Sequence, residues 1–186
     1  KNLKKIKRTR KNRIILSERL KKYSHRWRII TFVLNIEAVF LVIWSLSSKS
    51  DTNLISSFFA IYVILLQYLI NELNYNERSM KAHYHQLELN ELLVKLSMLK
   101  VKIKKDLSFD ESIKKIEKVM EIYQVSLKNN ENHSNRDDRV GKMNKYVPNH
   151  KLYDFSLDNI FIFLNLIICI IFFGYIFYLI MKGEII

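Results

Sequence analysis

The stretch IITFVLNIEAVFLVIWSL (Ile29–Leu46) is followed, after a short polar turn, by LISSFFAIYVILLQYLI (Leu54–Ile70). A helix rises about 1.5 Å per residue, so about 20 apolar residues cross a hydrocarbon core of about 30 Å. Both runs lie near the lower limit for a span. Backbone amides cannot stay unpaired in lipid, and spanning segments of this kind are therefore helices. The two runs predict a transmembrane helical hairpin.

A third apolar run, LDNIFIFLNLIICIIFFGYIFYLIM (Leu157–Met181), is the longest and is clearly long enough to span. The 186 residues include three Gly and one Pro, which leaves little turn chemistry for strands. The alternative is a soluble protein with three buried helices, but the length of the apolar runs disfavours it. The sequence predicts an all-α membrane protein: a transmembrane hairpin with long cytosolic helical extensions and a third, C-terminal transmembrane helix.

Positive charge is concentrated before the first span. Residues 1–28 contain thirteen Lys and Arg against a single acidic residue, Glu18, whereas residues 71–156 are nearly balanced. The positive-inside rule predicts that the N-terminus and residues 71–156 are cytoplasmic, with the C-terminus outside the inner membrane. The basic flank also favours contact with anionic lipid of the inner leaflet. Nucleic-acid binding is disfavoured, because Tyr23 and Trp27 are the only aromatic residues in this flank.

Apolar stripes at helical spacing organise the rest of the chain. Residues 1–28 form a basic amphipathic helix that enters the first span (29–46), and the second span (54–70) continues as a helix to residue 106. Ser108-x-x-Glu111 is a capping box for a helix over 109–128. These helices, within 1–28 and 71–128, are predicted to bury their stripes against one another. Residues 129–156 are a polar connector before the third helix (157–181); the connector's His and Asp residues lack metal-site spacing, and neither metal nor cofactor is expected.

Glu37 lies near the middle of the first span. Placing a carboxylate near the middle of a bilayer costs free energy. Its presence there favours either an ion pathway or a hydrogen-bonded contact between helices. Asn35 lies about 200° around the helix from Glu37 at about 100° per residue, on a different face. In the second span, polar and small side chains recur at steps of three or four. This spacing predicts either a contact surface between helices or the lining of a pore. The candidates for the pore or oligomer seam are Asn35, Glu37, Ser56, Ala60, Gln67 and Asn71.

No catalytic motif is present. The chain lacks a glycine-rich phosphate loop, a CxxC or HExxH motif and a GxSxG elbow. His83, Tyr84 and His85 are expected on an exposed, solvated helix face. We therefore expect a protein that is not an enzyme.

Three segments together resemble the SLATT domain. They are Arg26-Trp27 before the first span, NELNYNERSMKAHYHQLELNELLVKL (Asn71–Leu96), and the closing stretch Ile116–Asp138. The last contains the pattern formed by Tyr123, Glu131, Asn132, His133 and Asp137. The resemblance covers roughly residues 10–140, and the third span is less general in that family.

The resemblance implies a bacterial antiviral effector that oligomerises into a pore and stays silent until a partner senses infection. Such partners are nucleotide second-messenger synthases, nucleotide-sensing proteins or reverse transcriptases. The alternative is a non-conducting membrane scaffold whose cytosolic stalk docks a partner. The residues assigned to gating or to the family motif are Arg26, Trp27, Arg78, His83, Tyr123, Asn132, His133 and Asp137.

Overall fold

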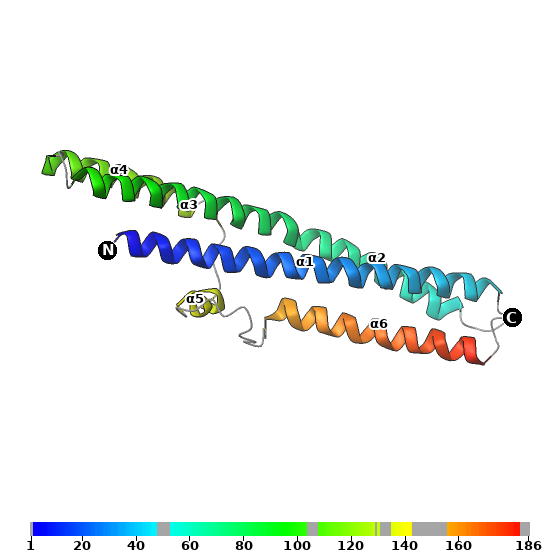
Figure 1. Cartoon of the computed structure of the whole chain (residues 1–186). Coiled ribbons are helices and arrows are strands. Elements are labelled where there is room, and N and C mark those ends of the chain that lie inside the picture. The colour runs from blue at the N-terminus through cyan, green and yellow to red at the C-terminus, as the bar shows by residue number, and fades with distance from the viewer. Residues whose placement is uncertain are drawn as a thin grey trace. The chain divides into compact units, whose positions relative to one another are not determined.

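A computed structural model describes residues 2–47, 53–103, 108–128, 130, 135–142 and 156–182 of the chain. These residues form helices and no strands (Figure 1). The helices are α1 (Asn2–Ser47), α2 (Asn53–Leu73), α3 (Tyr75–Ile103), α4 (Phe109–Lys128), α5 (Asn135–Lys142) and α6 (Leu157–Met181). The predicted all-α class is confirmed.

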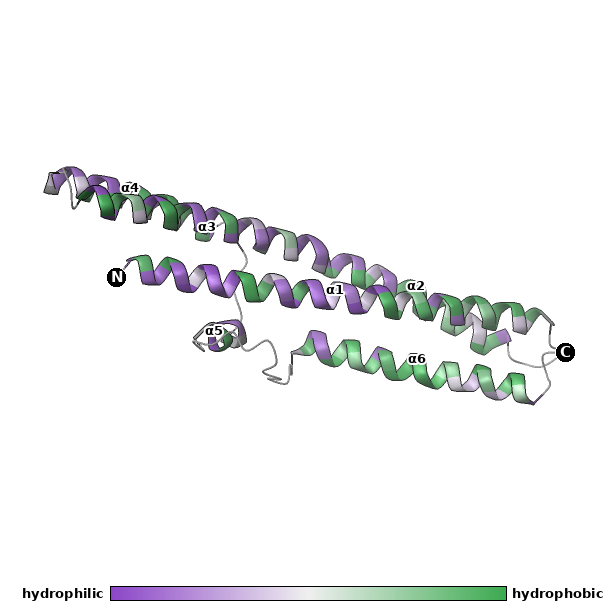
Figure 2. Cartoon of the chain, in the orientation of Figure 1, coloured by the Kyte–Doolittle hydropathy of each residue, from purple (hydrophilic) through white to green (hydrophobic). Residues whose placement is uncertain are grey.

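The chain divides into two compact units, and α1 contributes to both. Residues Lys1–Lys21 and Asn76–His150 form the first, which we call the polar unit. Residues Lys22–Tyr75 and Lys151–Ile186 form the second, which we call the membrane unit. Figure 2 shows that α2, α6 and the second half of α1 are predominantly apolar. Three helical stretches, Asn2–Leu46, Asn53–Ile103 and Leu157–Met181, are long and apolar enough to cross a membrane.

The polar unit is built on the stripes that the sequence predicts. Leu89, Leu92, Leu93 and Leu96 of α3 form one core cluster with side chains of α1 and α4, namely Ile6, Val119 and Tyr123. Leucines at steps of three and four lie on one face of a helix, which is why α3 buries this face against two neighbours. The predicted packing of the three helices is confirmed.

In the membrane unit, aromatic side chains join α6 to the other two helices. Phe59 of α2 stacks on Phe172 of α6, with ring centroids 3.9 Å apart. Trp27 of α1 packs on Phe161 of α6 at 5.3 Å between centroids. Such pairs add about 0.5–1.5 kcal/mol beyond the area that they bury. The third helix is thus an integral part of this unit.

The second long helix is interrupted, contrary to the prediction of a continuous helix through residue 106. Asn74 separates α2 from α3 and has a φ of 43°. Asn reaches this left-handed region more readily than most residues because its short side chain bonds locally. Its amide still donates to the Ile70 carbonyl oxygen at 3.3 Å, so a helical hydrogen bond bridges the break.

The connector predicted over residues 129–156 contains the short helix α5. Its sequence, NRDDRVGK, has no apolar stripe, so periodicity could not reveal it. Asp137 and Asp138 lie in its first turn, where negative charge interacts favourably with the helix dipole. The predicted polar connector thus contains a helix over residues 135–142 that the sequence analysis did not predict.

Candidate functional site

Glu37 is enclosed within the membrane unit. Its side chain is 3% exposed, and neither carboxylate oxygen has a hydrogen-bond partner in the part of the chain that the structure describes. The Cys169 thiol of α6 lies near enough for an electrostatic interaction with Glu37. The predicted carboxylate is therefore buried inside a single copy of the protein, with α6 nearby.

A second polar contact joins α2 to α6 in the same interior. The Tyr62 hydroxyl donates to the Asn165 side-chain oxygen, and Asn165 Nδ2 donates to the Phe161 carbonyl oxygen at 2.9 Å. Asn165 is 1% exposed and Cys169 is 6% exposed, in line with the packing that their spacing predicts. Sequence reasoning missed Tyr62, whose position in an apolar run gives no local signal.

Asn35 and Glu37 lie on different faces, as predicted. Gln67 Nε2 of α2 donates to Asn35 Oδ1 of α1 at 2.6 Å on the exposed side of the unit. This bond brings two of the predicted seam residues together within one copy. Polar contacts of this kind hold neighbouring helices together in lipid.

The other candidates on the second span do not share one surface. Ser56 is buried and donates to the Asn53 carbonyl oxygen at 3.0 Å, Ala60 is half-buried, and Asn71 is exposed. From residue 56 to 71 the direction of the side chain drifts by about 60° at about 100° per residue. The predicted stripe of the second span therefore passes from the interior of the unit to its surface.

The family-motif residues Arg26 and Trp27 contact the first turn of α6. Arg26 Nη1 donates to Asn159 Oδ1 at 2.8 Å, and the ring of the buried Trp27 packs on Phe161. Ser156, the N-cap of α6, shares a hydrogen bond of 2.9 Å with the Tyr23 hydroxyl.

The junction between α2 and α3 also reaches this turn. The Tyr75 hydroxyl donates to Asp158 Oδ1 at 2.7 Å, and the Tyr75 ring meets Tyr23 edge-on. Sequence reasoning missed Tyr75, Ser156, Asp158 and Asn159. A serine directly before an apolar run was the available signal for the cap.

Carboxylates of α5 hold this helix on α1 in the polar unit. Asp137 is fully buried, and its Oδ2 accepts from Arg19 Nη2 at 3.0 Å. Asp138 accepts from Arg8 Nε at 2.8 Å and from Asn12 Nδ2 at 3.1 Å. The family-motif residue Asp137 thus joins segments that are more than one hundred residues apart in sequence. We call these contacts the α5 clasp.

Tyr123 belongs to the same unit. It is 1% exposed, its hydroxyl lies 2.8 Å from Thr9 Oγ1, and Lys5 Nζ lies 5.6 Å from its ring centroid. These contacts join α4 to α1. Tyr123 is therefore a packing residue of the core.

His85 is buried, contrary to the expectation of an exposed face. It is 1% exposed, and neither ring nitrogen has a hydrogen-bond partner among the described residues. His83 is exposed, because two residues along a helix turn a side chain by about 200°. Burial, and then the nearby Arg13 guanidinium, lower the pKa of His85 to about 4. Arg78 is half-buried, and Asn132 and His133 lie outside the described residues.

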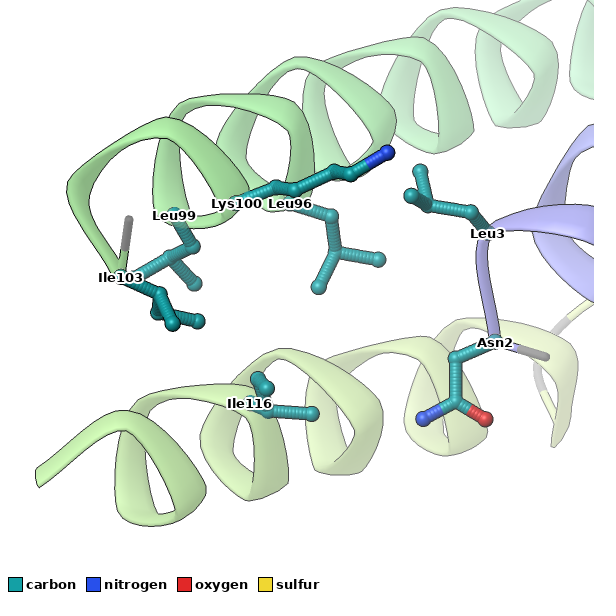
Figure 3. Close-up of a pocket in the computed structure, with 7 residues that line it drawn as sticks. All are labelled: Asn2, Leu3, Leu96, Leu99, Lys100, Ile103 and Ile116. Atoms are coloured by element: carbon teal, nitrogen blue, oxygen red, sulfur yellow. The ribbon is translucent and has the colours of Figure 1, made fainter. Parts of the chain in front are cut away.

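The polar unit also contains an apolar cavity of about 430 Å³ (Figure 3). Three helices line it: α1 with Asn2 and Leu3, α4 with Ile116, and the end of α3 with Leu96, Leu99, Lys100 and Ile103. None of the predicted site residues lies in this cavity. With one charged lining group, it lacks the convergent polar groups that orient a polar ligand.

Comparison with known proteins identifies the family. Searches of the curated proteins and of the solved structures found no significant match. Residues 1–180 match the SMODS and SLOG-associating 2TM effector domain family 5, and this match includes nearly all of α6. The chain therefore belongs to this SLATT family of effector domains.

Proposed function

We propose that this SLATT protein is the membrane effector of a bacterial anti-phage defence system. In this proposal it oligomerises in the inner membrane and forms a regulated pore when a partner senses infection, which arrests or kills the host. Opening requires no bond to be made or broken, so the protein acts without enzymatic activity. The observation that carries the proposal is the buried, unpartnered carboxylate of Glu37.

An ionisable side chain inside a span is costly and, where it occurs, commonly marks an ion or proton pathway. Glu37 of α1 is buried inside the membrane unit with Cys169 of α6 nearby, so a permeating cation reaches it only if the helices of this unit rearrange. The described arrangement then corresponds to the silent form of the effector. Movement of α6 within the membrane unit is the proposed opening step.

The α5 clasp offers a means of control. Release of α5 from α1, through loss of the Arg19–Asp137 and Arg8–Asp138 contacts, is the proposed response of the polar unit to the signal. In the proposed orientation the polar unit is cytoplasmic and receives the signal. The proposed partner is a nucleotide second-messenger synthase, a nucleotide-sensing protein or a reverse transcriptase.

The proposal is tested by ion flux from liposomes that contain the purified chain, with and without the proteins encoded beside it. A disulfide between Phe59→Cys and Phe172→Cys, in a Cys169→Ser background, would pin α6 to α2. We expect oxidation to abolish flux and a reductant to restore it, while each single-cysteine variant keeps flux under both conditions. Absence of flux from the unmodified chain, with its partner and signal present, would refute the pore.

A non-conducting scaffold is the second candidate. The observation in its favour is that Glu37 packs within one copy, where it needs no neighbour to be buried. In that case Glu37→Gln leaves antiviral protection intact, whereas charge reversal on the polar unit abolishes it. Measuring phage survival with both variants distinguishes the two functions.

A further inference from the structure

Helix α3 carries apolar side chains on two faces. Leu89, Leu92, Leu93 and Leu96 are buried in the core of the polar unit. A second set is between 44% and 60% exposed: Met80, Tyr84, Leu87, Val94, Met98 and Val101. Single exposed apolar residues are normal on proteins, but a continuous row of them marks an interaction surface. We call this second set the exposed α3 stripe.

The spacing of the exposed α3 stripe is that of a coiled-coil seam. Its members follow one another at alternating steps of four and three, with Glu91 at the one polar position. This 3.5-residue period keeps a narrow seam directed at one partner helix. From Met80 to Val101 the seam is about 32 Å long at about 1.5 Å per residue.

We propose that a second copy of this chain covers the exposed α3 stripe, in a parallel and in-register pair of α3 helices. Copies in one bilayer share their orientation, and α3 begins at Tyr75, directly after α2 and Asn74. In every copy, the same number of residues separates the apolar end of α2 from the start of the stripe. Two parallel copies therefore bring the same stripe residues to the same level. This inference deepens the proposed function, because it assigns a surface to the oligomerisation that the pore requires.

The charges beside the stripe favour the parallel arrangement. One flank carries the exposed residues Lys81, Glu88, Lys95 and Lys102, and the other carries His83, Asn90 and Ser97. In a parallel pair, each flank faces the opposite flank of the partner, so every charged residue meets a neutral side chain or a histidine. In an antiparallel pair, like flanks face each other: with Leu87 opposite Met98, Lys81 opposes Lys102, whereas Glu88 meets Lys95. The parallel pair thus avoids contacts between lysines at the flanks, and the shared orientation of copies in one bilayer favours the same arrangement.

Glu91 limits the strength of this pair. In register, it faces Glu91 of the second copy, and two carboxylates at one seam position repel. A polar seam residue fixes the register at a cost in stability. The α3 pair is therefore weak and reversible, as association under control of a signal requires.

Cysteine cross-linking of the full chain in liposomes tests this surface. Cys169 is the single cysteine, so a Cys169→Ser background allows one new cysteine at a time. We expect Leu87→Cys and Met98→Cys to form disulfide-linked dimers at least tenfold faster than Lys118→Cys, an exposed control on α4. Equal rates at the three positions would overturn the proposal, as would cross-links of the stripe to a different protein in place of dimers.

Mixing the two stripe variants tests direction. A parallel, in-register pair gives dimers within each variant and few between Leu87→Cys and Met98→Cys. Preferential linkage between the variants would overturn the parallel arrangement.

Substitution of Glu91 tests the seam itself. Glu91→Leu removes the repulsion and should speed dimer formation about tenfold, whereas an unchanged or lower rate would contradict a seam centred on this residue. Cross-linking is scored without any ion flux. Dimers without flux would contradict the pore alone, and flux without stripe-specific dimers would contradict this interface alone.

Discussion

The two units each bury a carboxylate, and they do so differently. Asp137 in the polar unit is fully buried and accepts a hydrogen bond from Arg19 at 3.0 Å. Glu37 in the membrane unit is 3% exposed and has no hydrogen-bond partner among the described residues. A buried carboxyl group without a hydrogen-bond partner is costly, so proteins usually pair it. Asp137 follows that rule and Glu37 does not.

The proposed function accounts for this difference. Asp137 holds α5 on α1, and its contact explains why the fold needs it. No contact of Glu37 explains its presence in a span, where an apolar residue of similar size would pack at lower cost. In the proposed function the carboxylate becomes exposed to a permeating ion when the pore opens.

The largest expected effect comes from breaking the paired carboxylate. Asp137→Asn removes the charge that Arg19 meets, and loss of one partner from a buried pair costs about 3–5 kcal/mol. We expect α5 to detach, which hydrogen exchange of the α5 amides measures directly. Protection of α5 equal to that of the unmodified chain would show that the clasp depends on other contacts.

His85 is a second buried titratable group that has no hydrogen-bond partner among the described residues, and it lies outside the spans. Its pKa in the fold is about 4, against an ordinary value of 6.5. The folded chain therefore binds a proton less readily than the unfolded chain between these two values. Stability contributed by neutral His85 is complete above about pH 6.5 and is lost as the pH falls toward 4.

The loss attributable to His85 amounts to about 3 kcal/mol, since one pKa unit corresponds to about 1.4 kcal/mol. Denaturation of the detergent-solubilised chain at pH 7 and pH 4.5 measures it. The His85→Gln variant should have a smaller difference in the free energy of unfolding between these pH values. An equal difference in both proteins would assign the acid sensitivity to other groups.

A smaller effect is expected at the neighbouring carboxylate. Asp138 meets Arg8, whose side chain is 53% exposed, and exposed ion pairs contribute about 0–1 kcal/mol. Asp138→Asn should therefore reduce α5 protection much less than Asp137→Asn, and 0.5 M salt should mimic it because salt screens exposed charges. An effect as large as that of Asp137→Asn would mean that the two carboxylates act as one network.

Long apolar runs and helical stripes were sufficient to predict the fold class. Leu157–Met181 is predicted as a span, and α6 has these bounds. Leu16, Leu20, Tyr23 and Trp27 recur at steps of four and three in the basic helix predicted over residues 1–28, and all four are buried. Burial of this kind is encoded locally, because the spacing of apolar residues determines which face is covered.

Contacts between distant polar residues could not be predicted in this way. The partners Arg19 and Asp137 are separated by 118 residues, and no local pattern joins them. The break at Asn74 depends on one backbone angle that an asparagine permits but does not require. For Glu37, the sequence identified the residue and the cost of placing it in a span, whereas its burial close to Cys169 of α6 depends on three-dimensional packing.

The smallest expected effect on stability is at Glu37 itself. Glu37→Gln keeps the size of the side chain and leaves one unpaired polar group in place of another, so the free energy of unfolding should change by less than about 1 kcal/mol. The same substitution removes the only carboxylate of the first span and should change the ion selectivity of the liposome flux. Glu37→Asp, which keeps the charge, is the matched control. If Glu37→Gln leaves stability unchanged but alters ion selectivity, Glu37 serves the ion pathway, whereas Asp137 serves the fold. If selectivity is also unchanged, Glu37 does not line the ion pathway.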